Sequence, residues 1–146
     1  MGGIILIIER NKLILIKEQE IEYKNKIRTP DELFNFAQSI IKINEEPDEV
    51  LYLVNFSSDN VVQSFMEVAR GSSNCCCVNM ADILKRVIIS NCKKFIIIHN
   101  HPSGNAKPST MDKVFTKELR KASEIIGIEF LDHIVVGDTT YKSCMI

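Results

Sequence analysis

Residues 95–104 read Phe-Ile-Ile-Ile-His-Asn-His-Pro-Ser-Gly, and this stretch decides how the rest of the chain is interpreted. Its first four residues are apolar and mostly β-branched, which predicts a short buried strand that ends at the histidines. Side chains two positions apart on a strand face the same way, so His99 and His101 can point into one site. The proline and glycine that follow break the strand and turn the chain.

An aspartate follows the histidines at a spacing that suits a metal site. Asp112 comes eleven residues after His101, across a turn. Two imidazoles and one carboxylate suit zinc, and three protein ligands leave a fourth position for water, as in catalytic rather than structural zinc sites. Iron or manganese could also occupy such a set. We therefore predict that His99, His101 and Asp112 bind a metal ion, with Zn²⁺ as the expected ion.

The same residues also have an ordinary structural interpretation. After Pro108, Ser109 suits the N-cap of a helix and Asp112 suits its first turn. Either histidine alone would more often be structural than a ligand, whereas the spaced set is harder to explain in that way. The contiguous letters His-Asn-His do not indicate a nuclease, because that label describes residues spread through a ββα-metal fold.

The spacing resembles a known metalloprotease pattern. His99-x-His101-Pro102, followed by Ser109 and Asp112, matches the JAMM motif, which is H-x-H-P and then S-x-x-D. Together with the downstream Leu131-Asp132-His133, the stretch is similar to the RadC branch of the JAB/MPN superfamily. Asp132 and His133 lie outside the predicted ligand set. Either could partner the free ring nitrogen of a ligand, or His133 could simply be a buried core histidine.

The resemblance extends from Arg28 to the C-terminus, with some departures. Family members carry a glutamate that opens the first core strand, and Glu49 stands in that position, fifty residues before His99. Their Gly-x-x-Asn turn is matched by residues 71–74, Gly-Ser-Ser-Asn. The usual Pro-Arg before the metal strand is Met80-Ala81 here, the usual Gly-Asp is Gly104-Asn105, and the helix-hairpin-helix region of full-length members has no counterpart. These departures leave the ligands intact but weaken the case for DNA engagement.

This resemblance implies an α/β (α+β) fold, with a mixed β-sheet flanked by helices in the JAB/MPN, cytidine-deaminase-like architecture. It implies a zinc-dependent hydrolase that cleaves an amide or isopeptide bond in a peptide or protein. Glu49 would act as general base toward the water, and Ser109 would help to hold the oxyanion. Glu49 lies in an acidic cluster over residues 45–49, so a plain solvated surface residue is the alternative.

Two other functions remain open. A RadC-like, DNA-repair-associated module could bind metal without catalysis, and a metal-dependent nuclease or phosphodiesterase is the third possibility. The formal net charge of −1 does not favour a nucleic-acid surface. Few further carboxylates lie near the motif, which argues against a two-metal centre. The oligomeric state is open.

The remaining chain predicts one compact domain, residues 28–146, preceded by an N-terminal β extension over residues 1–27. We expect strands at 4–8, 13–20, 49–56, 61–69, 75–78, 95–101, 128–136 and 141–145, with helices beginning near 30, following 78, and spanning 109–126. The strands at 49–56 and 61–69 should form a hairpin around the turn-rich residues 57–60. Strands interleaved with helices indicate an α/β or α+β class.

Five cysteines, three of them adjacent at 75–77, show no Cys-x-x-Cys spacing. They indicate small apolar filling of a strand in a reducing compartment, or less expectedly a thiol facing the metal pocket. No run of about eighteen apolar residues is present, so we expect no membrane span. The opening apolar run is too short for a signal peptide, and a cytoplasmic location is expected.

Overall fold

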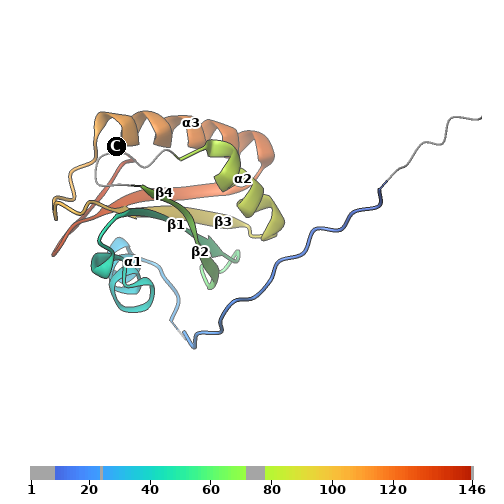
Figure 1. Cartoon of the computed structure of the whole chain (residues 1–146), viewed down its shortest axis with the longest axis horizontal. Helices are drawn as coiled ribbons and strands as arrows, with labels where there is room; N and C mark the ends of the chain where they lie inside the picture. Colours follow the sequence, from blue (N-terminus) through green and yellow to red (C-terminus); the bar gives the residue numbers. More distant parts are fainter. Residues whose placement is uncertain (1–8, 24, 72–77, 146) are drawn as a thin grey trace, which may run out of the picture.

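The structure, a computed structural model, describes residues 9–23, 25–71 and 78–145. It contains one five-stranded sheet and three α-helices, so the α/β fold with a mixed sheet predicted from the sequence is confirmed (Figure 1). The strands are β1 (Glu49–Phe56), β2 (Val62–Gly71), β3 (Lys94–Asn100), β4 (Glu129–Val136) and β5 (Tyr141–Ser143). The helices are α1 (Pro30–Phe36), α2 (Met80–Ile89) and α3 (Thr110–Ile126), and short π and 3₁₀ turns, Ala37–Ile41 and Ile43–Glu45, follow α1.

The sheet has the strand order β2-β1-β3-β4-β5. The pairs β2–β1, β1–β3 and β4–β5 are antiparallel, and β3–β4 is the one parallel pair among the described strands. The chain therefore crosses from β3 to β4 through α3, as parallel neighbours require. Because β1 is antiparallel to β3, the beginning of β1 lies beside the end of β3. The start of α3 lies at this same end of the two strands.

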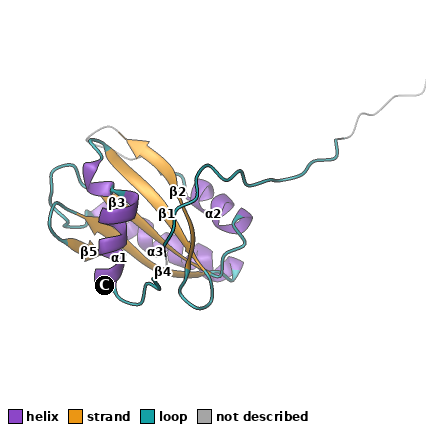
Figure 2. Cartoon of the chain, turned by 90° about the horizontal axis from the view of Figure 1, so that it is seen from below, coloured by secondary structure: helices purple, strands orange, loops and turns teal. Residues whose placement is uncertain are grey.

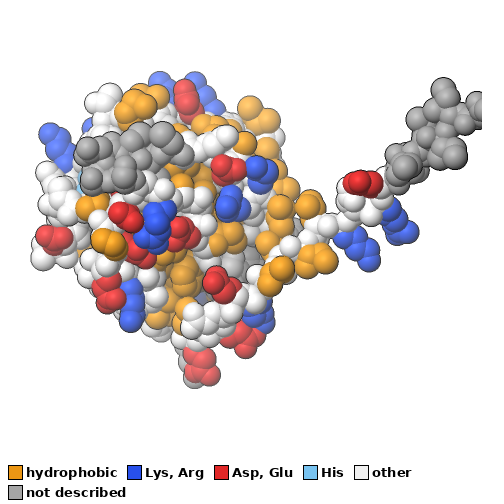
Figure 3. All heavy atoms as spheres, in the orientation of Figure 1, with side chains coloured by type: hydrophobic (Ala, Val, Ile, Leu, Met, Phe, Trp, Pro, Cys, Tyr) orange, Lys and Arg blue, Asp and Glu red, His pale blue; other side chains and the backbone are white. Residues whose placement is uncertain are grey.

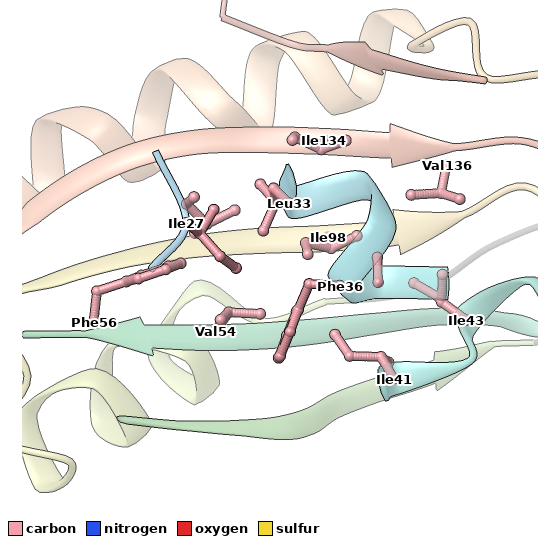
Figure 4. Close-up of a cluster of buried hydrophobic side chains, with 12 residues drawn as sticks. Ile27, Leu33, Phe36, Ile41, Ile43, Val54, Phe56, Ile98, Ile134 and Val136 are labelled. Atoms are coloured by element: carbon pink, nitrogen blue, oxygen red, sulfur yellow. The ribbon is translucent and has the colours of Figure 1, made fainter. Parts of the chain in front are cut away.

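Helices cover both faces of the sheet. Figures 1 and 2 show α2 and α3 on one face and α1 on the other. Strand alternation divides the apolar side chains between two clusters. One cluster joins α1 and its following turns to one sheet face, as Figure 4 shows for Leu33, Phe36, Val54 and Ile98. The other joins α2 and α3 to the opposite face and includes Ile97. His99 continues the alternation of Ile97 and so faces α3.

Local sequence explains the helix starts. At α1, the Thr29 side chain accepts a hydrogen bond from the Glu32 backbone and the Glu32 side chain accepts one from the Thr29 backbone, so both halves of a capping box are present. Asn79 caps α2, and Ser109 caps α3. The predicted hairpin of β1 and β2 is present, with Asn60 in the left-handed conformation at its turn (φ 59°).

The N-terminal segment differs from the sequence prediction. No strand forms over residues 13–20; residues 9–22 have no regular secondary structure and extend away from the domain (Figures 1 and 3). Leu13, Ile14 and Ile16 are exposed there. The β-branched run favours an extended backbone, but a strand also needs a partner, and none of the described strands pairs with it. The predicted strand at 4–8 lies outside the described residues.

Two other expectations fall wholly or partly on residues that are not described. These are the Gly-x-x-Asn turn at 71–74, of which only Gly71 is described, and the cysteine strand at 75–78, of which only Val78 is described and is not in a strand. Within the described residues, no helix has the length and apolar character needed to cross a membrane.

Candidate metal centre

The residues predicted to form the site come from three elements that meet at one end of the central strands β1 and β3. His99 lies near the end of β3 and His101 directly follows the strand. Asp112 lies in the first turn of α3, and Glu49 begins β1. The register pairs Leu51 of β1 with His99. Continued by two residues, this antiparallel register sets Glu49 opposite His101, and residues opposed in this way project to the same face of the sheet.

The potential ligand atoms converge. Glu49, His99 and His101 each offer one ligand atom, and these three atoms lie within 4.8 Å of one another. The Nε2 atoms of His99 and His101 are 3.0 Å apart. Asp112 Oδ1 lies 3.6 Å from His99 Nε2, and Asp112 Oδ2 lies 3.7 Å from His101 Nε2. The structure thus brings together the residues that the sequence singled out.

These separations are close to those between ligand atoms that share one metal ion. Ligand atoms about 2.0–2.2 Å from a tetrahedral zinc are roughly 3.3–3.6 Å from one another, from the geometry of a tetrahedron. The separation of 3.0 Å between the imidazoles, and those of 3.6 and 3.7 Å from them to the two different oxygens of Asp112, lie close to that range. The donor types, two imidazole nitrogens and a carboxylate, are those that zinc prefers. The residues present therefore fit a metal ion, and the geometry does not select which one.

Asp112 is both a member of the capping box of α3 and the proposed carboxylate ligand. Ser109 Oγ accepts a hydrogen bond from the Asp112 backbone N–H at 3.1 Å, and Asp112 Oδ2 accepts one from the Ser109 N–H at 2.6 Å. This capping box fixes the Asp112 side chain and turns its carboxylate toward the two imidazoles. The structural interpretation of Ser109 and Asp112 is therefore correct, and it is compatible with a role in metal binding.

Burial and charge shift the pKa values of the site. Burial lowers the pKa of His99 to about 4, although the Asp112 charge opposes the shift. Interaction with the Asp112 carboxylate raises the pKa of His101. Burial alone would raise the pKa of Asp112, but His101, His99 and the Ser109 hydrogen bonds outweigh it and the net direction is downward. Asp112 is thus kept as a carboxylate, and His99 is kept neutral.

Glu49 has a different environment. Burial raises its pKa, and the negative charge of Asp112 acts in the same direction, whereas His101 opposes it. A carboxylate whose pKa is moved up from its ordinary value toward neutrality is better suited to accept a proton and to pass it on. Glu49 is partly buried, in contrast to the exposed Glu45 of the same acidic cluster.

Asn100, the residue between the two histidines, fixes the backbone on both sides of Glu49. It is 4% exposed, and its Oδ1 accepts a hydrogen bond from the Val50 N–H at 2.8 Å. Its Nδ2 donates to the carbonyl of Asp48 at 2.9 Å and to that of Glu46 at 3.4 Å. No sequence motif marks Asn100, although strand alternation does place it on the face opposite to the histidines.

His133 and Thr116 extend the site inward. His133 Nε2 lies 2.8 Å from His99 Nδ1, so His133 is the ring partner that the sequence allowed. Asp132 Oδ1 instead accepts hydrogen bonds from the His133 backbone N–H at 2.7 Å and from Ser143 Oγ at 2.6 Å. Thr116 was not predicted, although its position four residues after Asp112 puts both on one face of α3.

Comparison with known proteins gives the class of the domain. The family model described as the RadC-like JAB domain matches residues 27–145. A protein named UPF0758 from Clostridium acetobutylicum is 36% identical over 118 residues, which are 81% of this chain and 51% of that protein. A UPF0758 protein from Pseudomonas fluorescens is 39% identical over 98 residues, covering 67% of this chain and 44% of that protein.

A third relative, a UPF0758 protein from Staphylococcus carnosus, is 34% identical over 125 residues, with 85% of this chain and 54% of that protein covered. The chain belongs to the RadC-like JAB domain family, as its motifs predicted. It spans about half the length of the curated relatives that it matches.

Proposed function

We propose that this chain is a zinc-dependent hydrolase of the JAMM type, which cleaves an amide or isopeptide bond in a peptide or protein substrate. One observation carries the proposal. Two imidazole Nε2 atoms and a carboxylate converge at the end of β3, with a second, partly buried carboxylate, Glu49, within 4.8 Å of both histidines. This arrangement supplies a set of metal ligands and a separate group for proton transfer.

In this proposal His99, His101 and Asp112 hold the metal. A zinc ion bound there would lower the pKa of a coordinated water and polarise the substrate carbonyl. Asp112 brings one negative charge to the site, and the helix cap holds its carboxylate in place. His101 is held in turn by its Nδ1, which lies 2.8 Å from the carbonyl of Asn105.

Glu49 is the proposed general base. Its carboxylate would accept a proton from the attacking water and deliver it to the leaving amine. The raised pKa of Glu49 supports this role, since burial shifts it toward neutrality. Glu49, His99 and His101 could themselves hold a metal ion, so metal retention in Glu49→Gln distinguishes a general base from a ligand.

Ser109 is the proposed oxyanion donor. In the helix cap, its oxygen accepts a hydrogen bond from the Asp112 N–H, which uses only a lone pair of the hydroxyl. No described residue accepts the hydroxyl hydrogen, which can therefore bind a substrate oxyanion, so the cap and the catalytic role can coexist on one side chain. One such donor is typically worth about 10²–10³ in rate.

The experiment is a hydrolysis screen of peptide and isopeptide substrates with zinc-loaded protein. We expect wild type to be active, His101→Ala to lose both zinc and activity, and Glu49→Gln to lose activity while zinc stays bound. Glu45→Gln is the matched control, since it removes the same charge from an exposed neighbour in the acidic cluster and should leave activity unchanged.

Activity that survives Glu49→Gln would contradict the proposed mechanism. Salt-sensitive DNA binding that does not depend on Glu49, in a protein without hydrolysis, would instead favour the binding-module alternative. Magnesium-dependent nicking of a plasmid that is lost in His101→Ala would favour the nuclease.

A further inference from the structure

A line of short contacts runs from the third proposed ligand back to the first, through the interior. Thr116 Oγ1 lies 2.6 Å from the Asp112 carbonyl oxygen and 2.6 Å from His133 Nδ1. His133 Nε2 lies 2.8 Å from His99 Nδ1. Thr116, His133 and His99 are 3%, 2% and 2% exposed, so water does not compete for these contacts.

The chemistry of each atom determines where the protons lie. Two oxygens at 2.6 Å need a hydrogen between them, and a carbonyl has none, so Thr116 donates its single hydroxyl hydrogen to Asp112. Thr116 can then only accept from His133, whose Nδ1 must carry a proton. A neutral His133 has no proton on Nε2, so that atom accepts from His99 Nδ1–H. A neutral His99 consequently has no proton on Nε2.

Both rings are neutral for a physical reason. Each ring is 2% exposed, and a second proton on either ring would place a positive charge in an interior that water does not reach. The described hydrogen-bond partners of the His133 ring are Thr116 and His99, neither of which is a carboxylate, and the Asp112 carboxylate lies 3.6 Å from His99 Nε2.

His101 reaches the same state independently. Its Nδ1 lies 2.8 Å from the carbonyl of Asn105, which can only accept, so Nδ1 carries the proton. In the neutral ring, Nε2 is then unprotonated. Two unprotonated nitrogens face each other at 3.0 Å, an arrangement that repels unless a cation, either a proton or a metal ion, lies against both.

We propose that Thr116 and His133 are positioning residues that hold His99 in its Nδ1–H tautomer and thereby present an unprotonated Nε2 to the metal. The inference rests on the proposed metal site and deepens it. The contacts from the Asp112 carbonyl through Thr116 and His133 to His99 form one relay, so the positions of two proposed ligands, Asp112 and His99, depend on each other. The relay acts before metal arrives, since it involves only side chains and backbone of the protein. Partners of this kind are typically worth about ten- to a hundredfold in metal affinity.

The first test reads the tautomers directly, without metal or activity. The chain has three histidines, so a long-range ¹H–¹⁵N spectrum of metal-free protein at mildly alkaline pH contains three rings. We expect all three in the Nδ1–H form. An Nε2–H form at His99 or at His133 would overturn the proposal.

The second test separates positioning from general stability. Thr116→Val keeps the shape of the side chain but cannot accept from His133, and Thr116→Ser restores the hydroxyl. We expect zinc affinity, measured by competition with a chelating dye, to fall about ten- to a hundredfold in Thr116→Val and to recover in Thr116→Ser. Ser123→Ala is the matched control, because Ser123 makes the same bond to a carbonyl four residues earlier in α3, at 2.7 Å, away from the histidines.

The outcomes distinguish this inference from the proposed function. Zinc affinity that is unchanged in Thr116→Val, or equally weakened in Ser123→Ala, would overturn the positioning role while leaving the hydrolase intact. A wild-type protein that binds no zinc would overturn the hydrolase and the metal-presenting role together. The tautomer spectrum would still decide whether the relay exists.

Discussion

Replacement of Asn100 by leucine tests how the domain holds Glu49 beside the histidines. The substitution keeps approximately the size of the side chain and removes every hydrogen bond that it makes. The Val50 N–H then has no partner in a position where Val50 itself is 0% exposed, and the carbonyl of Asp48 loses a donor at 2.9 Å. The longer contact to Glu46, at 3.4 Å, adds little.

The magnitude follows from these contacts. A buried N–H left unpaired costs about 1–3 kcal/mol, and the lost bond to Asp48 costs about 1 kcal/mol more. We therefore expect the free energy of unfolding to fall by about 2–4 kcal/mol in Asn100→Leu. Denaturant unfolding measures it, and an unchanged slope with denaturant would show that the fold is retained.

Asn55→Leu provides the matched control. Asn55 is also a fully buried asparagine of the sheet, but its Nδ2 bonds go to Ser64 and Ser90, and its Oδ1 has no partner among the described residues. Its loss should cost less, about 0–1.5 kcal/mol, because the partners are hydroxyls near the surface. An Asn100→Leu protein within about 0.5 kcal/mol of wild type, or as little affected as Asn55→Leu, would refute the role assigned to Asn100.

Three further outcomes are expected. Ser109→Ala should lose about 1 kcal/mol of stability and about 10²–10³ in turnover, whereas Thr29→Ala, which removes the matching cap of α1, should lose only stability, as denaturant melts and rate assays would show. In metal-free protein, stability should be greatest above pH 6.5 and fall as the pH drops toward about 4. The reason is that the unfolded histidines, with an ordinary pKa of 6.5, take up protons that folded His99 and His133 do not. Acid titration followed by circular dichroism measures this loss, and a flat profile would contradict it. Gly104→Ala should lower the melting temperature, since Gly104 has φ +77° and an added Cβ would meet the side chain of Asp138 at 2.3 Å; an unchanged melting temperature would contradict that geometry.

The sequence predicted the parts of the site that depend on short-range patterns. The apolar run before His99 predicted β3, and alternation predicted that His99 and His101 share a face. The family resemblance selected Glu49. The position of Ser109, directly after Pro108 and three residues before Asp112, marked it as a helix cap. These signals are local or are carried by a motif, so a single sequence contains them.

The rest depended on contacts between distant segments. The roles of Asn100 and Thr116 follow from the antiparallel register of β1 against β3 and from the packing of α3 on β4, neither of which a single sequence specifies. The predicted strand at 13–20 was wrong for the opposite reason. Its composition favours a strand, but a strand requires a partner edge, and the composition carries no information about one.

The most direct test of the account is the metal content of the purified protein, determined by elemental analysis for wild type, His101→Ala and Glu49→Gln after incubation with zinc. We expect close to one zinc per chain in wild type and in Glu49→Gln, and none in His101→Ala. Wild-type protein that retains no metal, or equal zinc in His101→Ala, would contradict the metal centre on which the proposed function depends.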